Sequence, residues 1–354
     1  MVTRLSFYFL LFETTFLSGG FAPALRAQES LKVEVARMSG EQRVIVNIDG
    51  KPFTEFVYAD SLEKPVLFPI YSPGGHIITR GFPMRPRTGE SNDHPHHLGL
   101  WFNYENVNGL DFWNNSYAIP QEKKNGYGRI RTDSILQIKS GNQGRIQFSA
   151  RWEDQQHHRL LKESTIFIFS ADSHKRIIDR ITKLTALMDV SFPDVKDGML
   201  GLRVTRELQL PTAESKQFTD NKGITTLVAG STDTVFNGNY LTGEGKKGDE
   251  AWGTRAAWCL LYGKINSDTV SIAIIDHPQN PGYPTYWHAR GYGLFAANPL
   301  GQKIFSNGKE ALNFSLKKGA SVIFRYRIVI AEGKTRLSNS QINELTSAFA
   351  QTGE

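Results

Sequence analysis

Three histidines and an aspartate occupy five consecutive positions with one proline in DHPHHLGLWF, residues 93–102, of a chain that has nine histidines. Pro95 favours an extended backbone at His94, so the imidazoles of His94 and His96 are expected to point the same way. A His-X-His pair on a strand is a common metal chelate once a carboxylate or a further histidine completes it. Without a metal, imidazoles that titrate near neutral pH transfer protons. A purely structural role, with the rings bonded to backbone carbonyls of a turn, is the third reading.

The tripeptide Asp-His-Pro returns at residues 276–278, where the apolar segment 270–275 ends, and it is followed by YWHARGYG. Five of the nine histidines therefore lie in two aromatic segments, which we expect to face each other across one cleft. The predicted catalytic residues are Asp93, His94, His96, His97, His277, His288 and Arg290. The sequence does not identify a cofactor. A divalent metal with His94 and His96 as candidate ligands is the alternative to metal-free chemistry.

The aromatic side chains in the same segments indicate the ligand. Flat rings beside Asn, Asp, Arg and His suit a small carbohydrate, which offers an apolar C–H face and hydroxyl groups, although aromatic rings are more often simply core. The predicted substrate-binding residues are Trp101, Asp111, Trp113, Arg203, Glu207, Asn280, Tyr286, Trp287 and Asn298. The leading hypothesis is an enzyme that uses histidine acid–base chemistry for hydrolysis, elimination or epimerisation of a sugar. A metal-dependent oxygenase or hydrolase and a non-catalytic sugar-binding module are the alternatives.

Alternating apolar and polar residues indicate the strands that must position these groups. The apolar residues of 145–152, 202–210 and 322–330 each fall on one face of an extended chain. Residues 140–145 look like a hairpin turn, and further strands are expected at 31–38, 42–49, 64–71, 162–170, 176–189 and 269–276. Many strands without alternating helices predict an all-β protein, a large antiparallel β-sandwich. A short C-terminal helix is expected after a capping box of Ser338 and Gln341.

The composition is that of a globular protein, and the start of the chain resembles an export signal. Of the 354 residues, 40% are hydrophobic and 21% are charged. The net charge of +6 is spread without a basic block, so no nucleic-acid partner is expected. Residues 1–27 are predicted to be a signal peptide, 28–334 a single β-sandwich domain and 335–354 a C-terminal helix and tail. The mature protein is then expected to be periplasmic or secreted, without stable membrane insertion. The single cysteine, Cys259, is expected to be a buried, inert thiol.

Three long motifs resemble a known family of exported bacterial proteins, the PmoA-like or methane oxygenase PmoA family. They are DHPHHLGLWFNYENVNGLDFW, DGMLGLRV and DHPQNPGYPTYWHARGYGLFAANPLG, and the resemblance covers roughly residues 50–331. Leu98 and Gly282 stand where that family often has arginine, which implies a different specificity or activity. The resemblance implies an antiparallel sandwich akin to the galactose-mutarotase-like supersandwich. Its family label is also the basis of the oxygenase alternative.

Overall fold

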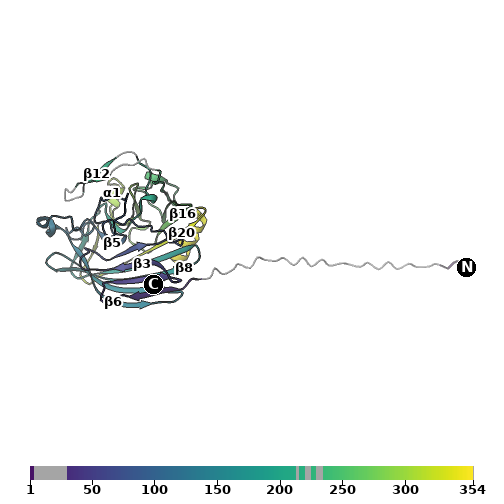
Figure 1. Ribbon diagram of the computed structural model, residues 1–354, viewed down its shortest axis with the longest axis horizontal. Coiled ribbons are helices and arrows are strands. Elements are labelled where there is room, and N and C mark those ends of the chain that lie inside the picture. Colours follow the sequence, from purple (N-terminus) through teal and green to yellow (C-terminus); the bar gives the residue numbers. More distant parts are fainter. Residues whose placement is uncertain (4–29, 213–214, 220–224, 229–233, 354) are drawn as a thin grey trace.

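Two eight-stranded antiparallel sheets form the computed structural model, which describes residues 1–3, 30–212, 215–219, 225–228 and 234–353 (Figure 1). The first sheet contains, in spatial order, β1 (Val33–Arg37), β2 (Arg43–Ile48), β3 (Lys51–Val57), β4 (Val66–Ile70), β5 (Leu100–Tyr104), β11 (Gly198–Arg203), β18 (Leu294–Asn298) and β17 (Tyr286–Arg290). The second sheet contains β14 (Asn239–Thr242), β15 (Trp258–Ile265), β16 (Asp268–Asp276), β20 (Ser321–Gly333), β9 (Lys175–Ala186), β8 (Arg159–Ala171), β7 (Gln143–Glu153) and β6 (Arg129–Lys139). The predicted antiparallel β-sandwich is confirmed.

The alternating pattern of the sequence explains which faces of the sheets are buried. In β7, every second residue from Ile146 to Trp152 is fully buried in the core between the sheets. In β20, Phe324, Tyr326 and Ile328 are buried in the same core. Because successive side chains of a strand point to opposite faces, each strand contributes every second residue to this layer. The hairpin turn predicted at 140–145 joins β6 to β7.

The strand predicted at 202–210 is wrong beyond its first two residues. β11 ends at Arg203, and Arg206–Leu208 form a single turn of 3-10 helix. The backbone amide of Thr205 donates to the carbonyl of Ile78 at 2.9 Å, which directs the chain out of the sheet. Leu208 and Leu210 are nevertheless buried, so the apolar pattern predicted burial correctly but not conformation.

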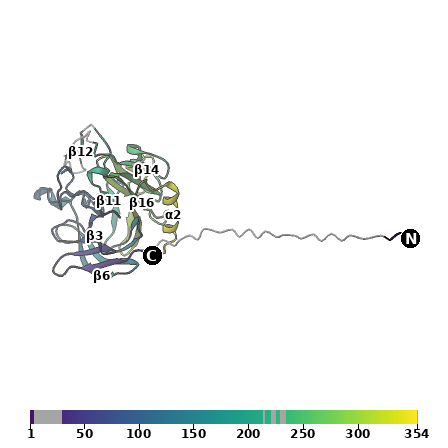
Figure 2. The same cartoon turned by 45° about the vertical axis from the view of Figure 1, so that its right-hand side comes forward.

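The C-terminal helix α2 (Asn339–Ala350) covers the outer face of the second sheet (Figure 2). Its predicted capping box is confirmed, because the Ser338 side chain accepts from the Gln341 amide while the Gln341 side chain accepts from the Ser338 amide. Ile342 and Phe349 then pack against apolar side chains of β15, β16 and β20. Helix α2 therefore gives the second sheet a second apolar layer.

The remaining elements are short. They are two-stranded ribbons β10 (Val190–Phe192) with β19 (Phe314–Leu316) and β12 (Lys216–Thr219) with β13 (Thr225–Val228), the helix α1 (Gln302–Phe305), and the 3-10 turns Gln121–Gly126, Arg206–Leu208 and Gly248–Ala251. In the part of the chain that the structure describes, no helix has the length and apolar character needed to span a bilayer. Cys259 is fully buried, as predicted, and burial raises the pKa of its thiol well above the ordinary value.

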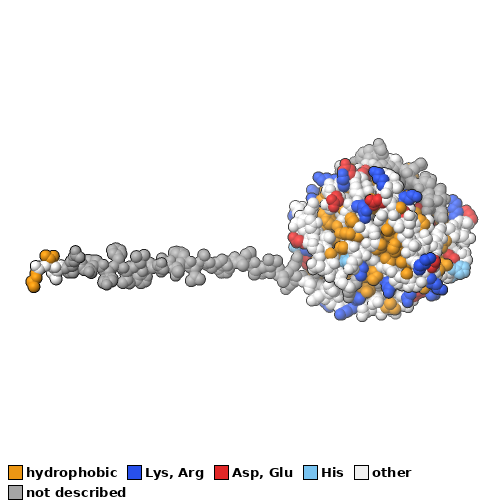
Figure 3. All heavy atoms as spheres, turned by 180° about the vertical axis from the view of Figure 1, so that it is seen from behind, with side chains coloured by type: hydrophobic (Ala, Val, Ile, Leu, Met, Phe, Trp, Pro, Cys, Tyr) orange, Lys and Arg blue, Asp and Glu red, His pale blue; other side chains and the backbone are white. Residues whose placement is uncertain are grey.

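Most of the predicted signal peptide, residues 4–27, lies outside the described residues, so the export signal and the periplasmic or secreted location stay predictions. On the surface that Figure 3 shows, basic and acidic side chains are interspersed around a central apolar area.

Candidate functional site

The candidate site is built on the outer face of the first sheet, away from the core between the sheets. Strand register aligns Trp101 of β5 with Gly201 of β11, Gly201 with Ala296 of β18, and Ala296 with His288 of β17. Residues that face each other in antiparallel strands share a face, so these four form one row across the sheet. A Cβ atom on Gly201 would lie 2.4 Å from Trp101 Cζ2 and 2.8 Å from Cη2 of Trp113. Glycine at this position therefore lets both indoles lie over β11.

The histidine motif lies at the end of this row as a tight turn rather than an extended strand. His94 has a φ of +44°, and the amide of His97 donates to the His94 carbonyl at 3.0 Å. The Arg80 guanidinium donates to the carbonyls of Asp93 (2.7 Å) and His94 (2.9 Å), which fixes the turn. The extended backbone predicted at His94 is therefore wrong, because tertiary hydrogen bonds override the preference of a residue that precedes proline.

Asp93 is the charged centre of the motif. Its carboxylate accepts from Arg80 at 2.7 Å and from Arg203 at 2.8 and 2.9 Å, and the side chains of both arginines are fully buried. Burial alone would raise the pKa of Asp93, but Arg203, the hydrogen bond with His94 and Arg80 hold it well below the ordinary value. Burial, followed by the charge of Arg203, lowers the pKa of Arg80 to about 9. Asp93 is therefore an anion at every physiological pH.

Asp93 and Arg203 also set the proton positions of two histidines. Asp93 Oδ2 lies 2.5 Å from His94 Nδ1, so neutral His94 carries its proton on Nδ1 and its lone pair on Nε2. Arg203 lies 3.2 Å from His97 Nδ1, which must accept and leaves the His97 proton on Nε2. Burial lowers the pKa of His94, only partly offset by Asp93, and with neighbouring cationic groups it lowers the pKa of His97 well below the ordinary value. Both rings are neutral at pH 7.

Aromatic stacking holds these rings in place. The His94 ring stacks on His97 (centroids 4.7 Å apart) and on Tyr292 (5.1 Å), with nearly parallel planes in both cases. His97 stacks in turn on Trp101 at 5.2 Å. His96 contacts the edge of His97 at 4.3 Å, and burial lowers its pKa well below the ordinary value. We call Arg80, Asp93, His94, His96, His97, Arg203 and Tyr292 the histidine cluster.

Lys64 is a buried cation beside the cluster that the sequence analysis missed. Its Nζ donates to the Trp113 carbonyl at 3.1 Å and lies 5.6 Å from the Trp101 ring centroid. Burial lowers the pKa of Lys64 to about 7, although the charge of Asp111 opposes this. The only signal in the sequence was a lysine at the start of the apolar segment 64–71, where a polar strand end is ordinary.

A second imidazole–carboxylate pair stands on the same face of the sheet. His288 Nδ1 lies 3.2 Å from Asp197 Oδ1, and the proximity of His288 and the charge of Lys196 outweigh burial and lower the pKa of Asp197. Glu105 lies beside Asp197 and accepts from its backbone amide at 3.1 Å. Burial, followed by repulsion from Asp197, raises the pKa of Glu105 to about 9. His288 was predicted from the sequence, whereas Asp197 and Glu105 were not, because their contacts depend on the pairing of β5 with β11.

His277 does not join the histidine cluster. It is fully buried, and its ring packs edge-on against Phe349 of helix α2 with centroids 5.0 Å apart. Phe349 belongs to the apolar layer outside the second sheet, whereas the cluster lies outside the first. The prediction that the two Asp-His-Pro segments meet at one cleft is therefore wrong for His277, whereas His288 lies on the same face of the first sheet as the cluster. Asp276 accepts from the Thr285 backbone amide and from the Asn280 side-chain amide, and so fixes the loop that follows β16.

Several predicted substrate-binding residues have side chains that are packed in the core or hydrogen-bonded to other groups of the protein. Trp287 lies in the core and its indole donates to the Ala256 carbonyl at 3.0 Å, which contradicts a role in stacking on a ligand. The Asn280 side chain bonds Asp276 and both backbone groups of Arg325, and that of Asn298 bonds three backbone groups. Asp111 accepts from the backbone and side chain of Asn114. Trp101 and Trp113 remain because they contact the cluster, and Arg203 belongs to it.

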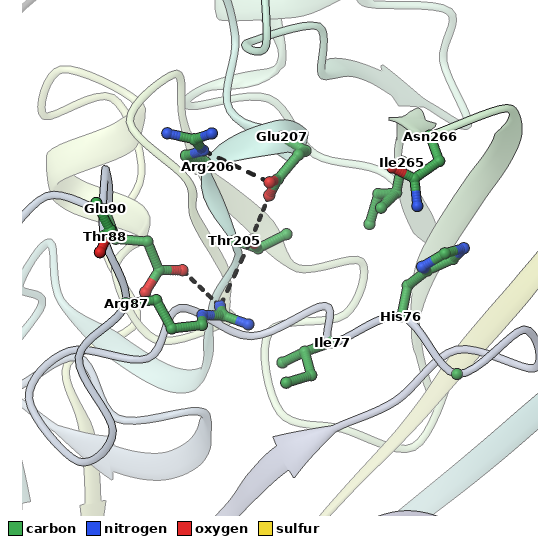
Figure 4. Close-up of a pocket in the computed structure, with 11 residues that line it drawn as sticks. His76, Ile77, Arg87, Thr88, Glu90, Thr205, Arg206, Glu207, Ile265 and Asn266 are labelled. Carbon is green, nitrogen blue, oxygen red and sulfur yellow. Dashed lines mark hydrogen bonds and ion pairs between the residues drawn. The ribbon is translucent and has the colours of Figure 1, made fainter.

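Three further predicted residues lie outside the histidine cluster. Tyr286 stacks on Phe305 and donates to Glu310 at 3.2 Å. The Arg290 guanidinium lies 5.3 Å from the Trp252 ring centroid. Glu207 lines a separate cavity of about 370 Å³, together with Arg206 and His76 (Figure 4). The structure thus brings together Asp93, His94, His96, His97, Trp101, Trp113 and Arg203, and places Glu207 elsewhere.

The predicted metal chelate of His94 and His96 has no third donor within reach among the described residues. Among the described residues, the group of three donors close enough to share a cation is His76, Asp268 and Glu332, which contains neither histidine.

Comparisons with solved structures find sugar-processing proteins at low similarity. A galactose mutarotase-like protein from Clostridium acetobutylicum is 9% identical with a TM-score of 0.40, covering 86% of this chain and 99% of that one. A galactose mutarotase related enzyme from Lactobacillus acidophilus is 8% identical with a TM-score of 0.32, covering 84% and 97%. A protein described as a kojibiose phosphorylase from the human microbiome is 8% identical with a TM-score of 0.28, covering 64% of this chain, which spans 25% of that protein's length. These TM-scores carry no conclusion about substrate.

The predicted membership of the PmoA-like family is wrong. No curated protein matches the sequence. The family model that matches is a different one, described as "Family of unknown function (DUF6807)", and it covers residues 43–347. The oxygenase alternative, which depended on the earlier label, loses its basis. Since the match covers most of the chain, this protein belongs to the DUF6807 family of unknown function.

Proposed function

We propose that this protein is an enzyme that transfers protons on a carbohydrate substrate, with His94 as the general base. The observation that carries the proposal is the 2.5 Å contact between Asp93 Oδ2 and His94 Nδ1. An ionised carboxylate on one ring nitrogen fixes the tautomer and orientation of the imidazole and stabilises the cation that forms when the other nitrogen takes a proton. Arg80 and Arg203 keep that carboxylate ionised.

A proton donor is also present on the same face of the first sheet. Glu105, whose pKa is raised to about 9, is protonated at pH 7, whereas His94 is neutral and able to accept a proton. Titratable groups whose environments push their pKa values apart are the usual basis for assigning an acid and a base. Proton abstraction at one position and donation at another is the chemistry of epimerisation and elimination.

The aromatic rings of the site support a carbohydrate as the substrate class. Tyr292 is stacked on His94 and keeps part of its ring exposed, whereas Trp101 and Trp113 are buried in the same apolar cluster. Rings with a polar neighbour bind the C–H face of a sugar while charged groups bind its hydroxyls. Arg290 and His288 stand on the same face and are proposed to orient the substrate.

The test begins with a thermal-shift screen of the purified protein against mono- and disaccharides. A sugar that stabilises the protein is then incubated with it in D₂O, and proton NMR follows the loss of a carbon-bound proton or the appearance of a new sugar. We expect exchange with the wild type and a loss of about 100-fold or more in His94→Gln, since general base catalysis contributes about 10²–10⁴-fold. His158→Gln, which alters an exposed histidine paired with Asp154, is the matched control.

Two outcomes would count against the proposal. Equal exchange rates in the wild type and His94→Gln would remove His94 from the reaction. Tight binding of one sugar without any exchange or conversion by the wild type would favour the sugar-binding module instead.

A further inference from the structure

A second group of side chains, which shares no residue with the histidine cluster, combines one imidazole with two carboxylates. His76, Asp268 and Glu332 each offer one donor atom, and the three atoms all lie within 4.8 Å of one another. We call these residues the His76 triad. It has no part in the proposed sugar chemistry, so it is an independent feature of the molecule.

The residues of the triad come from both halves of the sandwich. His76 lies in the loop that follows β4 of the first sheet, whereas Asp268 begins β16 and Glu332 lies near the end of β20 in the second sheet. The loop is tightened by Ser72, whose amide donates to the His76 carbonyl at 2.8 Å while its hydroxyl accepts from the His76 amide at 3.1 Å. The imidazole is thus held against the ends of two paired strands.

The distances suit a small divalent cation. His76 Nε2 lies 3.4 Å from Glu332 Oε1. Zinc binds imidazole nitrogen at about 2.0–2.1 Å and carboxylate oxygen at about 2.0–2.2 Å in tetrahedral geometry, which places two donors roughly 3.4 Å apart. The third donor, on Asp268, belongs to a side chain that is 31% exposed and able to turn toward the other two.

The Glu332 carboxylate is already oriented for such a role. Its Oε2 accepts from the Gly74 backbone amide at 2.8 Å, which leaves Oε1 on the side of His76. A Cβ atom on Gly74 would lie 2.2 Å from Oε1, so a glycine is needed for the carboxylate to sit here. Hydrogen bonds from outside the coordination shell that orient a ligand are typical of metal sites.

One neighbouring cation competes for the triad. Lys334 Nζ lies 2.8 Å from Asp268 Oδ1, and the lysine side chain is 83% exposed. Ion pairs between exposed side chains are weak, so a divalent cation is expected to displace this lysine.

We propose that the His76 triad binds one zinc-like divalent cation and that the ion links the two sheets. One imidazole and two carboxylates suit zinc better than calcium or magnesium, which take oxygen ligands. Three protein ligands leave a fourth position open, and His76 also lines the cavity of about 370 Å³. Figure 4 shows His76 on one side of this cavity and Arg87 and Arg206 on the other.

The test uses the full-length protein after treatment with a chelator. Zinc is titrated by calorimetry, and cobalt is added in parallel because its visible absorption reports tetrahedral coordination. We expect one equivalent to bind, with a rise in Tm of about 4 °C at a hundred-fold excess of zinc over its Kd. His76→Ala and Glu332→Gln should each abolish this stoichiometric binding and the shift in Tm.

Two further variants make the test specific. Lys334→Ala removes the competitor and should tighten zinc binding, whereas His158→Ala removes a surface imidazole that also pairs with a carboxylate and should leave it unchanged. Absence of binding by the wild type, or equal binding by the wild type, His76→Ala and Glu332→Gln, would show that the triad is an ion-pair network only. Unchanged affinity in Lys334→Ala would contradict the part assigned to Asp268.

Discussion

Replacing Asp93 by asparagine tests whether the histidine cluster depends on one buried charge. Asparagine keeps the shape of the side chain and one oxygen acceptor, but it removes the negative charge that faces Arg80 and Arg203. The side chain of Asp93 is 2% exposed and those of both arginines are 0% exposed, so solvent screens none of these contacts. The substitution therefore leaves two buried guanidinium groups without a counterion.

The expected loss of stability follows from this arrangement. Removing one partner of a buried ion pair costs about 3–5 kcal/mol, because the remaining charge stays desolvated. The folded-state pKa of Asp93 lies below its unfolded value of about 3.9. The stabilisation is therefore complete above about pH 4 and is lost as the pH falls through the folded-state pKa. The difference in the free energy of unfolding between the wild type and Asp93→Asn should be constant from about pH 5 to 8. It should become smaller in stronger acid.

Urea unfolding followed by tryptophan fluorescence measures this difference, since Trp101 and Trp113 lie over the cluster. Asp189→Asn is the matched control, because Asp189 and its partner Lys317 are exposed and no measurable loss is expected there. A loss below about 1 kcal/mol for Asp93→Asn would refute the reasoning, because it would place the pair in the range of surface ion pairs. A difference that did not narrow in acid would refute the assignment to the charge.

Three other substitutions test separate parts of the fold. Gly201→Ala should cost about 1–3 kcal/mol in urea unfolding, because the new methyl group would overlap the rigid indole of Trp101; an unchanged midpoint would contradict that contact. Lys64, with a folded-state pKa of about 7, makes stability rise between about pH 7 and 10, because only the unfolded chain keeps the proton there; Lys64→Met should flatten this rise in urea midpoints. Ser338→Ala should cost about 1 kcal/mol through loss of the helix cap, while Ser340→Ala should cost less; equal losses would argue against the capping box.

The fold was predictable from the sequence wherever one side of a strand faces the core. The alternation in β7 and β20 and the capping box before α2 all have their predicted structures. Alternation predicts burial more reliably than conformation, which is why Leu208 and Leu210 are buried although they do not lie in a strand.

The candidate site was only partly predictable, because its contacts join strands that are distant in the chain. The histidine motif was visible as a cluster, but Arg80, Lys64 and Asp197 reach the site through strand pairing and loop packing that no local pattern encodes. The repeated Asp-His-Pro tripeptide describes a local turn and carries no information on which sheet the turn will face. In β17, adjacent residues point to opposite faces, so an outward His288 already required an inward Trp287.

The row of side chains across the first sheet makes the proposed activity depend on the completeness of folding. Trp101, Gly201, Ala296 and His288 stand on four neighbouring strands drawn from three widely separated stretches of the chain. No contiguous fragment that lacks one of these stretches can assemble the row, and such long-range pairings form slowly because loop closure must precede them. Recovery of the proposed activity during refolding would thus report that β5, β11, β18 and β17 have paired. A proteolytic cut that releases β17 and β18 would abolish that activity while much of the second sheet stayed intact.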